Sequence, residues 1–431
     1  DRVTLGENPT PANSITRVDQ WPPQFRPGGA GFTGDQLDYL LNYQETMSST
    51  IPAFEYSNIT SMHRTFAVNK ELDIGNWEYV PYILPDCTTL EDAFSWNSYG
   101  IPLDDPRKGT FPRLKTSSAL ENAANCFAYC DLTGWINTDT ANPTDQPFEN
   151  TENVTNWNGC FYRYRGTSLS VDLKAGVTFR STFQSCFTWT TFPPGEADLN
   201  CMSNAEDIYS AWKSNVKLES FPAMKFPVAY DFTETWMGCE GLTSFPFIEI
   251  NRGNLVSQPL IVISTWENCV NLTGFPNLNF RGATYLRKAW GGCEKLNNLT
   301  DPDYPGAVYS FPEIDTQDVK DFGAAWRGCL ELTSFPVLDT SKGYYFYSAW
   351  NDCRKLTGFP LLDTSTGETF QNSWTYCEKL DNLTDPVLSN SSNFSFPEID
   401  TGAGWNFNYA WSTCSSMTSF PPLDFSGSRS T

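Results

Sequence analysis

Apolar and small residues recur along this chain in one fixed frame around an aromatic residue. Phe346 stands four positions before Trp350, Ala349 directly precedes it, and Cys353 follows three positions later. The same frame surrounds Trp326 and most of the other tryptophans. This i, i+3, i+4, i+7 spacing lies on one face of a helix, so it predicts a short helix of about two turns.

A second pattern follows each frame. The segment Leu-Thr-x-Phe-Pro, as at residues 332–336, suits a brief strand, and its proline marks the exit because proline donates no hydrogen bond. The sequence Leu-Asp-Thr then predicts a turn in which Asp and Thr bond their own backbone. No single coil of this kind buries its apolar side without its neighbours, so the pattern indicates a stacked repeat array.

We therefore predict an α/β repeat solenoid over residues 61–424, in which each coil holds a short helix or turn and a short parallel strand. The tightest spacing between anchors is 24 residues, as from Trp326 to Trp350. Thirteen coils follow from the aromatic anchors, which are Phe66, Phe94, Phe127, Trp157, Phe183, Trp212, Trp236, Trp266, Trp290, Trp326, Trp350, Trp374 and Trp411.

Thirteen cysteines would suit a disulfide framework, but the repeat indicates another role. Ten of them share one slot three residues after the anchor, and Asn takes that slot in three coils. Cys and Asn exchange where a small buried side chain bonds a neighbouring turn, so we interpret the slot as a column of buried thiols. Disulfides in the column, or between Cys87 and Cys201, are the alternative. The slot holds Asn69, Asn97, Cys130, Cys160, Cys186, Asn215, Cys239, Cys269, Cys293, Cys329, Cys353, Cys377 and Cys414.

The ends of the chain do not repeat. Residues 1–32 are rich in Pro and Gly and predict an extended arm that becomes ordered against a partner. Residues 36–47 predict a short amphipathic helix that caps the first coil, or else attaches the chain to a larger assembly. We assign residues 1–60 to this arm and cap, and residues 425–431 to a tail. Because the sequence begins at Asp1 and not at Met, we expect either that a leader has been removed or that this is part of a longer polypeptide.

Composition narrows the possible functions. The chain has 28 basic and 50 acidic residues and a net charge of −22, so we expect no binding to nucleic acid or to an anionic membrane. No apolar run reaches the roughly 18 residues of a membrane span. A Ser-His-Asp or Cys-His device would have to use His63, the single histidine, and we expect no enzyme.

The repeat frame resembles the bacterial leucine-rich-repeat family typified by BspA-like surface proteins and Treponema-type repeats. The family's alanine, aromatic, cysteine and leucine positions are filled by Ala325, Trp326, Cys329 and Leu332. Trp replaces the usual Phe or Met, and Phe-Pro replaces a simple apolar pair, which indicates a divergent branch such as a phage-borne one. The resemblance implies surface-exposed binding and adhesion without catalytic machinery.

Two coils carry an insertion at the same place. Loop A, residues 297–310, and loop B, residues 381–395, each follow a leucine and precede the sequence Phe-Pro-Glu-Ile-Asp-Thr. Equivalent positions of a solenoid share a face, so both loops should project from one side, and such insertions often mark the binding face. Neutral loop growth is the alternative, because long surface loops cost little free energy.

Aromatic residues outside the core frame are the candidates for partner binding. Exposed Trp and Tyr side chains can stack on sugar rings or anchor a protein partner, whereas ordinary packing between coils is the alternative. The candidates are Tyr304, Tyr309, Tyr345, Tyr347, Phe394 and Trp405.

Acidic residues recur at the turns. Their carboxylates could bind Ca²⁺, which takes about six to eight oxygen ligands. We favour a solvated acidic edge in which Asp caps each turn, and we expect no resident metal or cofactor. The residues are Glu313, Asp315, Asp339, Asp363, Glu398, Asp400 and Asp424.

The sequence therefore predicts a non-enzymatic binding or adhesion protein that recognises a protein or glycan receptor. We expect it outside the cell, on a cell surface or on a virion. The alternative is a structural subunit of a larger extracellular particle, such as a virion decoration or tail appendage, docked on neighbouring subunits through residues 1–60.

Overall fold

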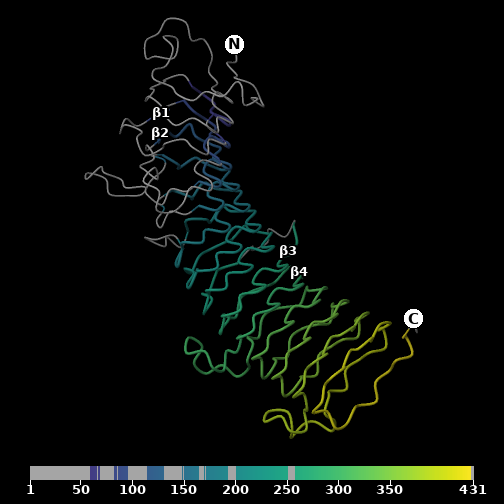
Figure 1. Cartoon of the computed structure of the whole chain (residues 1–431). Helices are drawn as coiled ribbons and strands as arrows, with labels where there is room; N and C mark the ends of the chain where they lie inside the picture. The colour runs from purple at the N-terminus through teal and green to yellow at the C-terminus, as the bar shows by residue number, and fades with distance from the viewer. Residues whose placement is uncertain are drawn as a thin grey trace, which may run out of the picture. The chain divides into compact units, whose positions relative to one another are not determined.

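The computed structural model describes residues 59–65, 67, 82–84, 86–95, 114–130, 148, 150–164, 169, 171–192, 200–250 and 258–428. The arm and capping helix predicted before residue 59 lie outside these residues. The chain divides into two units, Asp1–Ala205 and Glu206–Thr431, and each is built of stacked coils (Figure 1).

In the part of the chain that the structure describes, four short strands pair in parallel within the units. In unit 1, β1 (Tyr82–Leu84) pairs with β2 (Leu114–Thr116), and in unit 2, β3 (Leu260–Ile261) pairs with β4 (Ala283–Tyr285). Elsewhere, successive coils meet in parallel through single bridges five residues before the anchor. In unit 1 these bridges run through Ser61, Thr89, Asn122, Asn156 and Thr178, and in unit 2 the longest series runs through Tyr285, Asp321, Tyr345, Thr369 and Asn406.

The short helix expected around each anchor is a run of turns instead. In the coil of Trp326, alternate N–H groups from Phe322 to Gly328 donate to carbonyls of the next coil at 2.8 to 2.9 Å. Between them, the N–H groups of Ala325 and Arg327 close four-residue turns within the coil. Ala324 and Gly328 have positive φ angles of 55° and 76°. In an α-helix each interior N–H donates to the carbonyl four residues earlier, and every φ is negative, so the helix prediction was wrong.

The strand expected at Leu-Thr-x-Phe-Pro was also misplaced. All four strands of the described residues lie ahead of the anchors, and the Leu-Thr segments meet through isolated contacts. Thr273 N–H donates to the carbonyl of Thr243 at 2.8 Å, for example. The proline and the turn that follow leave too few residues there for a longer ladder.

Stacked aromatic rings fill the interior of unit 2. Consecutive indoles lie 5.3 to 5.7 Å apart with planes within 8° of parallel. The phenylalanine of a Phe-Pro pair between two tryptophan anchors meets both indoles edge-on, as Phe359 does with Trp350 at 4.7 Å and Trp374 at 5.3 Å. Offset and edge-to-face arrangements suit the ring quadrupoles, so each coil adds one interlocked aromatic layer. The stacked indoles belong to Trp212, Trp236, Trp266, Trp290, Trp326, Trp350, Trp374 and Trp411.

One anchor in unit 1 was assigned out of phase. Phe161, rather than Trp157, stacks between Phe127 and Phe183, at centroid distances of 6.1 and 5.9 Å. Trp157 therefore holds the apolar position four residues earlier, and Cys160 holds the small position before the anchor. Two aromatic residues four apart fit the same frame, and only stacking against neighbouring coils distinguishes them.

The remaining column cysteines bond the backbone of the preceding coil. The thiol of Cys353 donates to the carbonyl of Trp326 at 3.2 Å, and the thiol of Cys377 donates to that of Trp350 at 3.2 Å. Both thiols are buried and free, and burial raises the pKa of each well above its usual value. Among the described residues, the slot thus supplies a thiol donor to the preceding coil at nine steps of the stack.

Because burial raises the thiol pKa, we expect the free energy of unfolding to fall as pH rises above about 9, the ordinary thiol value. Unfolded thiols release their protons there while native ones keep them, so each contributes a slope of about −1.4 kcal/mol per pH unit. Urea unfolding from about pH 8 to pH 11 measures this slope. The Cys353→Ala variant removes one thiol and should show a shallower slope; equal slopes would contradict the assignment.

Candidate functional site

Loops A and B close at their necks with the same backbone hydrogen bond. Asn298 N–H donates to the carbonyl of Ser310 at 2.9 Å in loop A, and Asn382 N–H donates to that of Ser395 at 2.8 Å in loop B. The phenylalanines that follow the loops stack in one column with those of the coils between. Both loops consequently leave the same edge of unit 2 (Figure 1).

A buried asparagine ties each loop to the preceding coil. The side chain of Asn298 accepts from the N–H of Phe275 at 3.0 Å and donates to its carbonyl at 2.8 Å. Asn382 makes the same pair of bonds with Phe359, both at 2.8 Å. Both amides are almost fully buried, so each loop starts from a rigid base.

A buried aspartate makes a second connection. Asp301 accepts from the hydroxyl of Thr273 at 2.5 Å, and Asp385 accepts from the hydroxyl of Thr357 at 2.7 Å. Each aspartate also caps its own loop, since Asp301 accepts from the N–H of Asp303 at 2.7 Å. These residues were missed, although the Asn-Leu-Thr-Asp-Pro sequence common to both loops was a signal for them.

Tyr304 in loop A is held flat against unit 2. Its hydroxyl donates to the carbonyl of Phe245, two coils earlier, at 2.6 Å. Its ring covers Gly274, where an added Cβ would overlap the ring. Burial and the neighbouring Asp301 raise the pKa of Tyr304, so the hydroxyl stays protonated as a donor.

A hollow of about 410 Å³ opens beside this ring. Loop A contributes Tyr304 to Tyr309, and the coils contribute Asn277 and Glu313, which each follow a Phe-Pro pair. A second hollow of about 310 Å³ lies between Tyr304 and Phe247. Volumes of this size suit small ligands.

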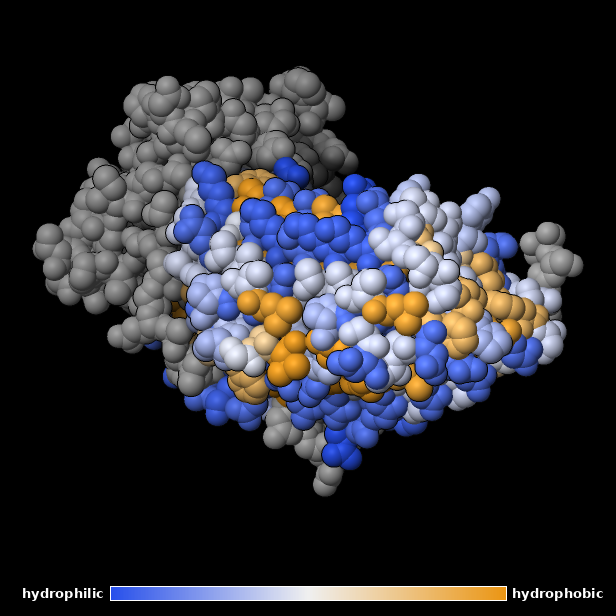
Figure 2. Space-filling view, turned by 90° about the horizontal axis from the view of Figure 1, so that it is seen from below, coloured by the Kyte–Doolittle hydropathy of each residue, from blue (hydrophilic) through white to orange (hydrophobic). Residues whose placement is uncertain are grey.

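Exposed apolar residues continue the same column between the loops. Val337 and Leu361, which follow the next two Phe-Pro pairs, have 61% and 63% of their surface exposed. We define the loop face as loops A and B with the residues Asn277, Glu313, Val337, Leu361 and Glu398. Figure 2 shows apolar patches separated by polar residues on the face of the molecule that is seen from below.

The structure divides the predicted aromatic candidates into two groups. Tyr304 and Tyr309 share the loop A hollow, while Phe394 is half-buried in loop B. The others, Tyr345, Tyr347 and Trp405, lie in the segments that precede the anchors and line none of the loop A hollows. Tyr345 and Trp405 are exposed.

The acidic turns form the expected capped edge. Asp363 accepts from the N–H and the hydroxyl of Ser365 at 3.0 and 2.7 Å, and these bonds hold its pKa below the usual value. Asp339 makes the same bonds with Ser341. Equivalent N–H bonds reach Asp315, Asp400 and Asp424. One carboxylate oxygen of each is thus directed to its own turn.

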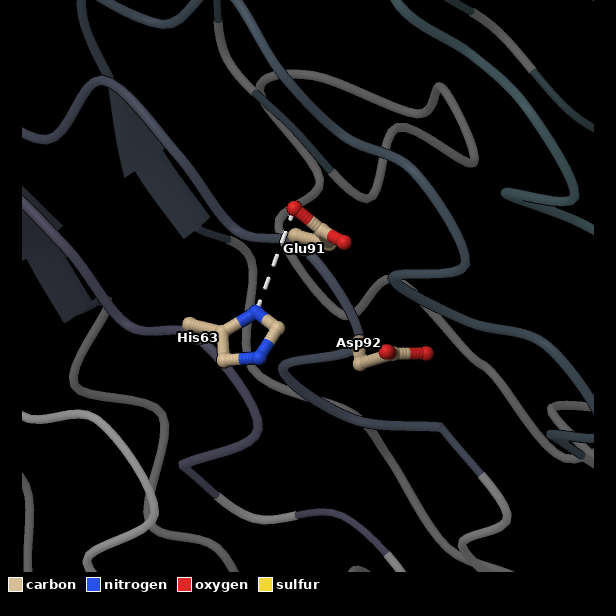
Figure 3. A group of neighbouring side chains, drawn as sticks. All are labelled: His63, Glu91 and Asp92. Carbon is tan, nitrogen blue, oxygen red and sulfur yellow. Dashed lines mark ion pairs between the residues drawn. The ribbon is translucent and has the colours of Figure 1, made fainter.

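Among the described residues, one cluster could hold a metal ion: His63, Glu91 and Asp92, whose ligand atoms lie within 4.8 Å of one another (Figure 3). His63 Nδ1 is 3.9 Å from a Glu91 oxygen. Arg64 donates to Asp92 at 3.1 Å and Asn122 donates to Glu91 at 3.2 Å. A cation would have to compete with both donors, so the cluster resembles ordinary pairing between coils.

Comparisons with known proteins add little. No family model and no curated protein matches the chain. The chain is similar to the crystal structure of a leucine-rich repeat protein from Bacteroides ovatus, with 16% identity, a TM-score of 0.39, and coverage of 77% of this chain and 69% of that one. This similarity is too weak to transfer any property. No helix in the described residues is long and apolar enough to cross a membrane.

The buried side chain of Asn382 predicts how the stability of the protein responds to mutations in loop B. Asn382→Ala leaves the N–H and carbonyl of Phe359 unpaired and should lower the free energy of unfolding by about 2 kcal/mol or more. Asn390→Ala, at an exposed position of the same loop, should change it by less than about 0.5 kcal/mol. Urea unfolding, with amide exchange at Phe359, measures both. Equal effects would contradict the assigned role.

Proposed function

We propose that this chain is a non-enzymatic binding protein and that the loop face of unit 2 is its recognition surface. The observation that carries the proposal is the matched attachment of the two loops, through Asn298 with Asp301 and through Asn382 with Asp385. Loops that had grown neutrally would have no need of the same buried polar connections twice.

Rigid loops favour binding because little conformational entropy is lost when a partner is bound. The loops also present apolar side chains to solvent, among them Val308 in loop A and Val387 in loop B. With Val337 and Leu361 between them, they form a mixed apolar and polar surface of the kind found at recognition sites.

The proposed setting is the exterior of a cell or of a particle, with membership of the BspA-like leucine-rich-repeat family. The support is the repeat frame of Ala325, Trp326, Cys329 and Leu332, together with the stacked coils. The acidic composition suits a receptor that is neutral or cationic. Docking on a larger particle through residues 1–60 is the alternative, and of these residues the structure describes Ile59 and Thr60.

Excision of either loop tests the proposal. Deleting residues 298–309 or 382–394 restores the length of an uninterrupted coil, and circular dichroism of each variant verifies folding. The intact chain should bind at least one surface on a panel of glycan-coated, matrix-protein-coated and whole-cell surfaces, and each deletion should weaken that binding by at least about tenfold.

The matched control is Tyr345→Ala, which removes an exposed aromatic side chain outside the loop face. This variant should bind as the intact chain does. Undiminished binding by both deletion variants would rule out the loop face, and loss of binding by Tyr345→Ala alone would place recognition on the segments before the anchors.

A further inference from the structure

We propose that the hollow beside loop A binds an uncharged saccharide, with the ring of Tyr304 as its stacking platform. This inference rests on the proposed function and specifies the ligand of one of its two loops. It depends on three features of the hollow: a fixed aromatic ring, two polar side chains beside it, and an acidic surrounding.

The platform is fixed before any ligand arrives. Tyr304 is held at its hydroxyl by the carbonyl of Phe245 and lies over the bare backbone of Gly274. Tyr304 lines two hollows and is half-buried, so part of its side chain remains accessible. A sugar ring has an apolar C–H face that packs on an aromatic surface, and a fixed tyrosine loses little entropy on binding.

Two polar side chains stand beside the platform. Asn277 and Glu313 are exposed, line the hollow, and belong to adjacent coils. The amide of Asn277 can both donate and accept a hydrogen bond, and the carboxylate of Glu313 accepts. Sugar hydroxyls do both as well, so the pair matches a ring that carries hydroxyls at its edge. Asn298, by contrast, is already committed to the backbone of Phe275.

The charge of the hollow excludes anionic ligands. Glu313 lines it, and Asp315 and Asp303 line the two neighbouring hollows. Phosphate, sialic acid or a uronic acid would meet like charge there, at a cost that grows as water is displaced. An uncharged saccharide avoids this repulsion.

Loop B provides an internal contrast. The same positions hold Leu361 in place of Asn277, Leu388 in place of Tyr304, and Phe394 in place of Tyr309. At loop B, the amide of Asn277 and the hydroxyls of both tyrosines are replaced by apolar groups. These groups would suit contact with an apolar protein surface better than contact with a sugar. The two loops therefore differ in ligand chemistry although they are attached in the same way.

Calorimetric titration of the full chain tests the inference. The probes are cellohexaose, mannohexaose and N-acetylchitohexaose as uncharged saccharides, with polygalacturonate as the anionic one. At least one uncharged probe should bind, and polygalacturonate should not. Asn277→Leu introduces leucine, the residue that Leu361 provides at the equivalent position before loop B. This variant should weaken binding by at least about tenfold, as should Tyr304→Leu.

The matched control is Leu361→Ala in the coil that precedes loop B, which should leave saccharide binding unchanged. Circular dichroism of each variant verifies folding, and Asn277→Leu is expected to fold because leucine occupies the equivalent exposed position. The inference is overturned if no uncharged probe binds, if only polygalacturonate binds, or if both loop A substitutions leave binding intact. Binding to a protein-coated surface that depends on the loops, without any saccharide binding, would preserve the proposed function and reject this inference.

Discussion

The contact between neighbouring coils around the aromatic anchor is the interaction on which the rest of unit 2 depends. Alternate N–H groups of each anchor segment donate forward to the next coil while the others close turns, so the backbone is satisfied in two directions at once. This arrangement sets the register of every step. It also brings the indoles face to face and places a phenylalanine ring edge-on between each pair.

The polar residues of the repeat serve the same contact. The thiol of Cys353 donates to the backbone of the preceding coil, and the hydroxyl of Thr340 donates to the carbonyl of Asp363 in the following coil. Asp363 in turn caps its own turn through Ser365. Small side-chain donors at fixed positions thus add hydrogen bonds to backbone carbonyls of neighbouring coils. This explains why Cys and Thr recur as regularly as Trp.

The two loops interrupt this stack without weakening it, because their own side chains rejoin it. Asn298 and Asn382 each form hydrogen bonds with both the N–H and the carbonyl of the phenylalanine in the preceding coil. These bonds anchor the loops to the stack. The tips can then vary in chemistry independently of the core. Loop A carries tyrosine beside Asn277, and loop B carries leucine and phenylalanine beside Leu361.

Residue spacing alone specified the repeat, the aromatic core, the cysteine slot and the positions of both loops, because identical residues at identical spacing must meet equivalent surroundings. Tertiary structure decided what local patterns leave open. Apolar residues four positions apart fit a helix and a run of turns equally, and hydrogen bonds between coils select the turns. Stacking on neighbours selects Phe161 over Trp157 as an anchor. The hydrogen bond from Tyr304 to Phe245 joins residues that are 59 positions apart in the sequence, so only the folded stack brings the candidate site together.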